Sequence, residues 1–297
     1  MGEIERSTWK FSEGDEIGPD RYALRRLGGG KQYEVYLAWD EDLYALVVAK
    51  LVRPHLATEP GALRSLAREA EVVGGLNHPV IVRIFGATLD GERPQLALEF
   101  LEGPRLSRLI RKYGKLELDQ LLPLALQVCS ALHHLARRGV VHLDVKPSNI
   151  IMGSPPRLID FSIARDVGRA REISSPVGTD GYMAPEQCDP GRAEIGSAAD
   201  VWGLGATLFH AVAGRPPFPR AAGYDRNDRN QRFPQLGRDP ERLPTDVPAP
   251  LAEAIAACLA PDPSDRPTPA AVADALEPAV AALPTRPVLR RMRPRLR

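Results

Sequence analysis

The chain has 297 residues, of which 43% are hydrophobic and 26% charged, so it can bury a sizeable core in one domain or two lobes. The formal net charge is +1, but residues 286–297 hold six arginines and no acid, so the rest of the chain is mildly acidic, unlike a nucleic-acid-binding protein. Apolar runs long enough for a transmembrane helix are missing and three scattered cysteines suit neither a disulfide framework nor a zinc site, so we expect a cytoplasmic protein with reduced thiols.

The N-terminal third has the pattern of a β-rich region. Short runs rich in β-branched and apolar residues predict strands over residues 22–27, 35–39, 46–52 and 95–101. One helix is expected among them, over residues 61–73, because Leu63, Leu66, Ala70 and Val73 recur at helical spacing.

Two features of this region have a plain and a functional interpretation. Gly28, Gly29 and Gly30 form either a simple hairpin turn or a flap whose bare backbone N–H groups approach phosphate oxygens. Lys50 ends a strand, where a lysine often extends its amine to solvent; alternatively it pairs with Glu69, since an inward-facing carboxylate would need a cation.

Helices dominate from residue 106 onward. They are predicted over residues 118–138, 198–213, 251–259 and 269–276, with Asp119 as the N-cap of the first. The second is apolar on all sides, which predicts a buried central helix. A small β-rich lobe followed by a larger helical lobe is an α+β, two-lobed architecture. Segments 1–18 and 284–297 lack an amphipathic period, and we expect both to lie outside the fold.

The strongest chemical pattern is His-Leu-Asp-Val-Lys-Pro-Ser-Asn at residues 142–149, followed by Asp160-Phe-Ser. Each half alone is compatible with an exposed polar loop or a turn. Together they bring three oxygen-bearing side chains from two loops, of which Asp160 and Asn149 suit Mg²⁺. Asp144 is then placed to orient a hydroxyl for in-line attack, with Lys146 as a charge beside the transferred phosphoryl group.

On these residues the sequence resembles the eukaryotic-like bacterial Ser/Thr protein kinases, from about residue 21 to 276. The glycine-rich turn, the strand lysine, the helix glutamate and both loops stand in family order. Further matches follow at residues 178–186, 200–206, 214–218 and 265–267. The resemblance implies transfer of the ATP γ-phosphate to Ser/Thr hydroxyls of protein substrates, with Mg²⁺, or Mn²⁺ in its place.

The resemblance also assigns residues and boundaries. Asp144 is implied as the catalytic base, with Lys146 and Asn149 beside it, and Asn149 and Asp160 as metal ligands. The ATP-binding residues it implies are Leu27, Gly28, Gly30, Val35, Val48, Lys50, Glu69, Glu99, Leu101 and Ile151. Its boundaries are an N-terminal extension (1–18), a kinase domain (19–280; N-lobe 19–98, hinge 99–104, C-lobe 105–280) and an arginine-rich tail (281–297).

Several structural roles follow from the same resemblance. Glu186 is expected to pair with Arg266, Asp200 to brace the catalytic loop, and the Thr179 hydroxyl to bridge Asp144 and Lys146. Residues 184–186 correspond to a peptide-docking segment, which favours protein substrates over small metabolites.

Four positions depart from the family pattern. Tyr33 replaces the third flap glycine, where it either stiffens the loop or lays a ring over the nucleotide. Val48 adds bulk near adenine, and Ser162 replaces a glycine after Asp-Phe. Leu143 replaces an arginine, so a phosphate on the activation loop lacks its usual bidentate partner.

This last change predicts activity that does not depend strongly on phosphorylation of the loop over residues 163–179. The loop contains Ser174 and Ser175, whereas Arg171 and Ile173 occupy positions at which bacterial relatives often carry phosphorylated threonines. The alternative is that the two serines belong to a merely polar surface loop.

Other interpretations stay open at this point. Tyr33, Val48 and Ser162 also fit a pseudokinase that acts as a scaffold. The arginine-rich end fits a solvated tail, a contact with an anionic membrane surface, or docking of a partner, either a substrate or a nucleic acid. No specific nucleic-acid partner is expected, and the sequence gives no indication of the oligomeric state.

Overall fold

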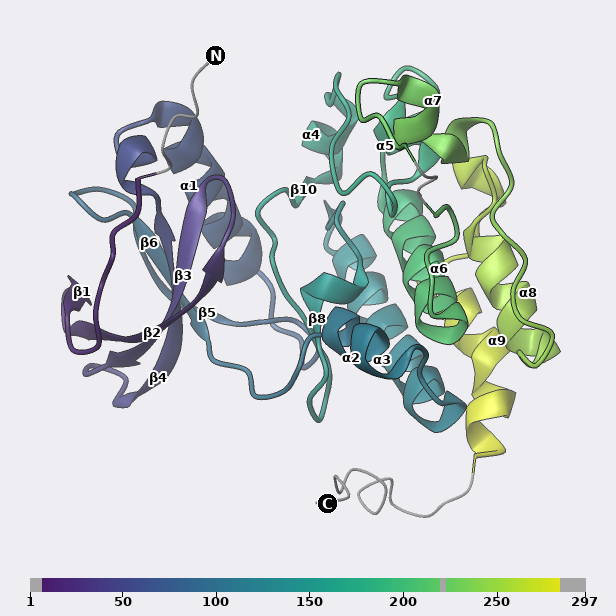
Figure 1. The fold of residues 1–297 in the computed structure, drawn as a ribbon, viewed down its shortest axis with the longest axis horizontal. Helices are drawn as coiled ribbons and strands as arrows, with labels where there is room; N and C mark the ends of the chain where they lie inside the picture. Colours follow the sequence, from purple (N-terminus) through teal and green to yellow (C-terminus); the bar gives the residue numbers. More distant parts are fainter. Residues whose placement is uncertain (1–6, 220–222, 284–297) are drawn as a thin grey trace.

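The computed structural model describes residues 7–219 and 223–283, which form a small β-rich lobe and a larger helical lobe (Figure 1). The small lobe is a six-stranded antiparallel sheet in the order β1-β2-β3-β4-β6-β5. Its strands are β1 (Glu16–Gly18), β2 (Arg21–Gly29), β3 (Tyr33–Asp40), β4 (Ala45–Val52), β5 (Ile84–Thr88) and β6 (Gln95–Glu99). The prediction of a two-lobed α+β fold is confirmed.

Helix α1 (Pro60–Gly74) lies against the sheet (Figure 1). Proline at its first position suits the helix start, where no intrahelical N–H bond is lost. Its buried residues, Ala62, Leu66, Glu69 and Val73, recur every three or four positions, so they share one face. That face carries Glu69 inward together with the apolar side chains, which sets the position of its carboxylate.

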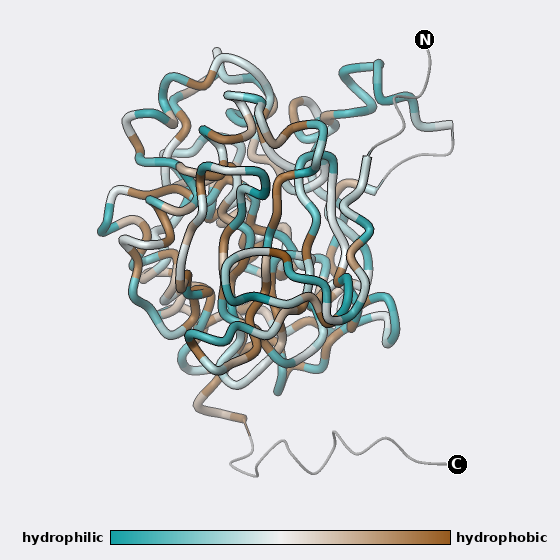
Figure 2. The backbone as a smooth tube through the Cα atoms, turned by 90° about the vertical axis from the view of Figure 1, so that its left-hand side faces the viewer, coloured by the Kyte–Doolittle hydropathy of each residue, from teal (hydrophilic) through white to brown (hydrophobic). Residues whose placement is uncertain are grey.

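The larger lobe is built around α6, which is buried on nearly all sides because its side chains are almost all apolar or small. Helices α3 and α8 pack against it, and α9 packs against α3 and α8 on the right of Figure 1. The helices are α2 (Leu106–Tyr113), α3 (Leu118–Arg137), α4 (Val167–Arg171), α5 (Pro185–Cys188), α6 (Ser197–Ala213), α7 (Arg229–Arg232), α8 (Ala249–Cys258) and α9 (Pro269–Ala281). Figure 2 shows hydrophobic stretches running through the interior and hydrophilic loops around it.

Two short antiparallel strand pairs position the loops of this lobe. Strand β7 (Val140–Val141) pairs with β10 (Arg165–Asp166), and β8 (Ile150–Ile151) pairs with β9 (Arg157–Leu158). The segment between β7 and β8 and the segment between β9 and β10 are thereby held side by side. These two segments carry the Asp144 and Asp160 motifs.

The expectation that residues 1–18 lie outside the fold is wrong for residues 7–18. Trp9 and Phe11 pack on the sheet, the Trp9 indole N–H donates to the Val52 carbonyl at 2.8 Å, and Ile17 in β1 is fully buried. The segment docks through isolated aromatic side chains and a three-residue strand, so it has no helical or strand period that a sequence pattern could detect.

Two helix ends also differ from the prediction. Glu117, not Asp119, occupies the N-cap position of α3, and Asp119 lies in the first turn, where its charge favours the positive end of the helix dipole. Helix α9 continues to Ala281 rather than ending at Leu276, despite Pro278 inside it. Residues 284–297, including the arginine-rich tail, lie outside the described residues. Within the described part of the chain, no helix combines the length and apolarity needed to cross a membrane.

Candidate active site

The glycine turn between β2 and β3 has room on its open side. A Cβ built on Gly29 would come within 2.6 Å of the Tyr33 carbonyl oxygen, so the turn closes tightly only with glycine there. A Cβ on Gly28 or Gly30 would meet no atom within 4 Å, so the backbone at both positions is free to approach a ligand. In the adjoining sheet, Val35 on β3 lies opposite Lys50 on β4.

Lys50 links the two lobes through a pair of carboxylates. Its Nζ donates to both oxygens of Glu69 at 2.8 Å and to Oδ1 of Asp160 at 3.0 Å. Burial alone lowers the pKa of Lys50, but the charges of Glu69 and Asp160 outweigh it, so the pKa lies above the ordinary value. The lysine is therefore a permanent cation between α1 and the loop after β9.

Asp160 is poised beside this cation with its carboxylate ionised. Burial by itself raises its pKa, yet the Lys50 charge and hydrogen bond, with a further bond from Ser162, hold the pKa well below the usual range. Its backbone has φ of 66°, a left-handed conformation that is uncommon for a residue with a side chain. The neighbouring Phe161 is buried and packs edge-on against the His142 ring, with centroids 4.6 Å apart.

The Asp144 carboxylate is the centre of a second network. Lys146 Nζ donates to its Oδ2 at 2.6 Å, and the Thr179 hydroxyl donates to its Oδ1 at 2.7 Å. Lys146 also donates to Thr179 Oγ1 at 2.6 Å, so the threonine bridges the two charged groups as the resemblance implied. Asn149 Nδ2 donates at 3.0 Å both to the Asp144 backbone carbonyl and to Oδ2.

The loop that carries Asp144 is held from beneath by Asp200 on α6. The buried Asp200 carboxylate accepts from the backbone N–H of His142 and of Leu143, both at 2.7 Å. These two bonds stabilise Leu143 in a left-handed conformation with φ of 68°. The expected bracing role of Asp200 is confirmed.

A second ion pair fixes the segment that follows Thr179. Arg266 donates to both carboxylate oxygens of Glu186, at 2.6 and 2.9 Å, and both side chains are fully buried. Arg266 also donates to backbone carbonyls of three residues, Ala198, Ala260 and Pro261, so its donors are satisfied. The predicted pair is therefore present.

The donor set at Asn149 and Asp160 fits a hard divalent cation. The Asn149 amide nitrogen is engaged with Asp144, which turns the amide oxygen to the opposite side. The Asp160 carboxylate is 39% exposed and held by Lys50 through one oxygen only. A carboxylate and an amide oxygen are the ligands that Mg²⁺ and Mn²⁺ take. The Ile159 backbone N–H donates to the Asn149 carbonyl, which keeps the two segments adjacent.

The remaining residues that the resemblance assigns to ATP binding lie on β2, β4 and β8 and at the connection between the lobes, which follows β6. Leu27 is exposed at the end of β2, Val48 is half-buried on β4, and Ile151 is half-buried on β8. Leu101 follows β6 and packs on the core of the larger lobe. Glu99, at the end of β6, accepts from the Arg157 guanidinium at 3.0 Å, so its side chain ties the connection to β9.

Sequence reasoning missed one residue that organises this site, the buried Gln187 on α5. Its amide nitrogen donates to the carbonyls of Leu143 and Val177, at 2.8 and 2.9 Å, and its oxygen accepts from the Ala184 N–H. The residue thus joins the Asp144 loop to the loop before Thr179. The only sequence signal was its place directly after Glu186.

Lys50 bonds Glu69 of the small lobe and Asp160 of the larger lobe, and the larger lobe also carries the loop with Asp144, Lys146 and Asn149. This combination of two lobes and polar residues defines a protein kinase domain. A family model described as a protein kinase domain matches residues 22–276. The chain belongs to this family, and its relatives place it in the bacterial serine/threonine branch.

Three relatives carry the name serine/threonine-protein kinase. PknB of Mycolicibacterium smegmatis is 32% identical over 83% of this chain and 41% of its own length. PkaA of Streptomyces coelicolor is 35% identical over 75% and 41%, and PknB of Mycobacterium tuberculosis is 32% identical over 80% and 40%. The chain thus spans about two fifths of the length of these relatives. Membership of the family implies the use of ATP and a divalent metal ion.

Proposed function

We propose that this chain is an active protein kinase that transfers the γ-phosphoryl group of ATP to serine or threonine hydroxyls of protein substrates. The observation that carries the proposal is the Asp144 carboxylate, held between Lys146, Thr179 and Asn149 at hydrogen-bonding distances. The arrangement supports the proposal because in-line phosphoryl transfer requires an acceptor for a hydroxyl proton next to a cation.

In this proposal the protein mainly positions groups and stabilises charge. Asp144 accepts the hydrogen bond of the substrate hydroxyl and orients its oxygen, while Lys146 faces the developing charge on the transferred group. Lys50, fixed by Glu69 at 2.8 Å, is the cation for the other phosphates of the nucleotide. Asn149 and Asp160 would hold Mg²⁺, or Mn²⁺ in its place, which when bound neutralises charge on the phosphate oxygens.

The nucleotide is proposed to lie between the glycine turn and the loops of the larger lobe. Gly28 and Gly30 leave open space for phosphate groups to approach the turn, in which the Gly30 N–H donates to the Tyr33 carbonyl at 2.9 Å. Apolar side chains on both sides would contact the adenine: Leu27, Val35, Val48, Leu101 and Ile151. The backbone from Glu99 to Leu101 is left to read the adenine edge, since the Glu99 side chain is engaged with Arg157.

The alternative of a pseudokinase scaffold draws on Tyr33, Val48 and Ser162. Against it, the Tyr33 ring is buried beneath the sheet beside α1. Ser162 supports the ionised state of Asp160 through a hydrogen bond. Both side chains are therefore compatible with nucleotide and metal at the proposed positions, and we favour the active kinase.

Substitution Asp144→Asn tests the proposal on the 297-residue chain. We expect autophosphorylation, and phosphate incorporation into a generic basic protein, to fall by about 100-fold or more, because the charge that orients the hydroxyl is lost. Lys50→Met should have the same effect. Asp42→Asn, at an exposed turn between β3 and β4, makes the same chemical change far from the motif and should leave activity unchanged.

Thermal shifts with ATP, with and without Mg²⁺, accompany the activity assay. A wild-type chain that gains stability from ATP and Mg²⁺ but incorporates no phosphate would support the scaffold instead. An Asp144→Asn variant that retained wild-type turnover would overturn the role given to Asp144.

Two finer parts of the proposal rest on composition. A cytoplasmic location agrees with the three cysteines, all of which are buried and unpaired. The suggested contact of the tail with an anionic membrane surface, or with a partner, rests only on its six arginines.

A further inference from the structure

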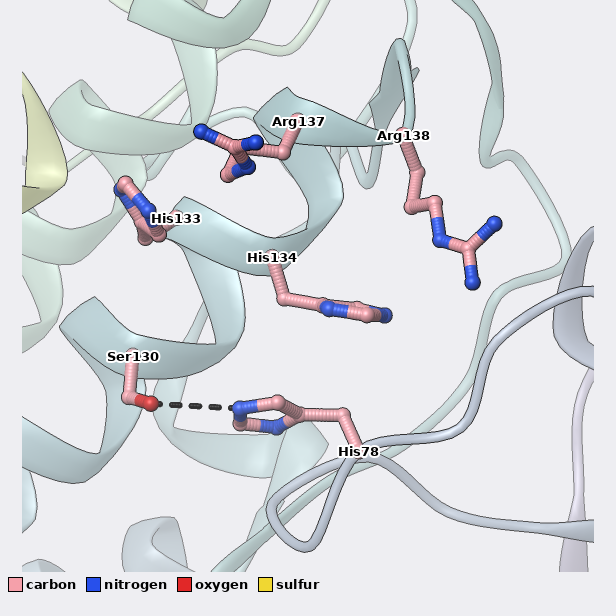
Figure 3. A pocket seen from close by; sticks show the side chains of 6 residues that line it. All are labelled: His78, Ser130, His133, His134, Arg137 and Arg138. Atoms are coloured by element: carbon pink, nitrogen blue, oxygen red, sulfur yellow. Dashed lines mark hydrogen bonds between the residues drawn. The ribbon is translucent and has the colours of Figure 1, made fainter.

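A polar pocket lies on the larger lobe, apart from the residues of the candidate active site. We call it the histidine pocket: it is about 440 Å³ in volume and is lined by His78, Ser130, His133, His134, Arg137 and Arg138 (Figure 3). His78 comes from the loop between α1 and β5, and the others come from the end of α3. All six side chains are polar or basic, and none is acidic.

The two central imidazoles are stacked and use their nitrogens differently. The His78 and His134 ring centroids are 5.1 Å apart. The Val80 N–H donates to His78 Nδ1 at 3.2 Å, so in the neutral ring Nε2 carries the hydrogen and donates to Ser130 Oγ at 3.1 Å. The Ser130 hydroxyl hydrogen is then free to turn into the pocket.

His134 has an unused nitrogen at the same place. Its Nε2 is buried and has no hydrogen-bond partner among the described residues. Buried polar atoms are nearly always paired in proteins, so an orphan of this kind calls for a ligand or water. Figure 3 shows the His134 ring lying over His78, with Arg138 on the right of the ring and Arg137 extending to the left, toward His133.

The arginines add unpaired positive charge. Within residues 7–219 and 223–283, neither Arg137 nor Arg138 forms an ion pair or a side-chain hydrogen bond, and both are exposed. Burial first, then the charges of Arg138 and His133, hold the pKa of His134 below its usual value. The pKa of His78 is also below its usual value, because of burial first and then the charges of His134 and Arg157. The charges acting on both rings are thus all positive.

We propose that the histidine pocket binds a phosphate group, either as the free ion or carried on a phosphorylated serine or threonine. Arginine guanidinium groups match phosphate oxygens with paired donors, and Ser130 and His134 supply two further donors. A carboxylate has only two oxygens and would leave part of this donor set unused. A metal ion is disfavoured because the pocket has no anionic ligand and several cations.

The adjoining pocket shares Arg138 and, unlike the histidine pocket, includes acidic residues in its lining. Its lining includes Arg68, Glu71, Asp166 and Arg169. Asp166 is paired with Arg169 at 3.4 Å, so it does not neutralise Arg138. The positive groups near the two histidines are Arg137, Arg138, His133 and Arg157. A bound dianion would offset their charge, so its binding should favour the protonated His134 ring. His78 should change less, because protonation of its Nδ1 would break the bond from Val80.

Titration of the histidine ring protons by NMR tests the proposal directly, and it is independent of catalysis. Inorganic phosphate at millimolar concentration should shift the His134 ring signal saturably, raise its pKa, and bind more tightly at pH 6 than at pH 8. Arg138→Gln and Arg137→Gln should each weaken this binding about tenfold, as expected for loss of a charge-assisted hydrogen bond.

The matched control is Arg111→Gln, at an exposed arginine of α2 that lines neither pocket, which should bind phosphate like the wild type. His134→Asn should bind phosphate more weakly at pH 6 while keeping the fold. An unsaturable shift, or equal binding by the wild type and the two pocket variants, would overturn the site. Titration with an N-acetyl phosphoserine amide distinguishes the sources: tighter binding than phosphate indicates a phosphorylated residue, and weaker binding indicates the free ion.

Discussion

The Tyr33 side chain occupies a position that the family pattern gives to glycine. It points beneath the sheet, where it packs with Val52, Ala62 and Leu66 and is only 7% exposed. Its ring centroid lies 4.7 Å from Lys50 Nζ, close enough for a cation–π contact. Of the two alternatives raised by the sequence, a ring that stiffens the flap agrees with this placement, and a ring laid over the nucleotide does not.

Tyr33→Ala is therefore expected to lower the free energy of unfolding by about 3 kcal/mol or more, because it leaves a cavity between β3, β4 and α1. It should also lower activity, since Lys50 loses a neighbour that holds it beside Glu69. Tyr33→Phe is the matched control: it keeps the ring, and we expect near-wild-type stability and activity. Denaturant unfolding and autophosphorylation rates measure both effects. Equal stability of Tyr33→Ala and wild type would contradict this role.

At the scale of elements, the segment from β10 to Thr179 is held without phosphate. Asp166 caps α4 by accepting from the Arg169 N–H, and Gln187 joins Val177 to Leu143. Leu143, which stands where a phosphate-binding arginine is usual, is buried in the core at 3% exposure. Contacts within the chain thus order this segment, as a loop phosphate bound to an arginine does in other kinases.

We therefore expect the double change Ser174→Ala and Ser175→Ala to alter activity by less than about threefold, under 1 kcal/mol of transition-state free energy. Gln187→Met keeps the volume but leaves two buried carbonyls without their donor, and should reduce activity about tenfold or more. Phosphate transfer by each variant, and by phosphatase-treated wild type, measures the difference. A tenfold loss in the serine variant or after phosphatase treatment would show that loop phosphorylation is required.

At the scale of the whole molecule, the segment over residues 7–18 is part of the small lobe. Trp9 stacks on Phe11 with centroids 5.7 Å apart, and Phe11 meets the edge of Tyr36 at 5.5 Å. The Trp9 backbone N–H donates to Glu34, whose buried carboxylate also pairs with Arg53. The segment thus covers one face of the sheet with aromatic side chains and donates a hydrogen bond to a buried carboxylate.

Trp9→Ala should lower the free energy of unfolding by about 2 kcal/mol and Tm by about 4 °C, because a half-buried ring and a hydrogen bond to Val52 are lost. Glu13→Ala, at an exposed position of the same segment, is the control and should leave Tm unchanged. Calorimetry of both variants checks the contribution. An unchanged Tm for Trp9→Ala would show that the segment does not stabilise the lobe.

The sequence by itself determined the architecture and most of the chemistry. The period and length of the apolar runs identified the main strands and helices. Helices such as α1 and α6 bury whole faces, so their apolar residues recur at a regular spacing. The order of the motifs pointed to Lys50, Asp144 and Asp160, because phosphoryl transfer needs a cation, a hydroxyl acceptor and metal ligands in a restricted set of residue types.

Only the tertiary structure decided how separate segments meet. The docking of Trp9, the bridging by Gln187 and the stacking of His78 on His134 each join positions that no local period connects. Such contacts depend on which surfaces the folded chain brings together, and a sequence pattern reports only the neighbours within one strand or helix. The cations around His134 became visible as one site for the same reason.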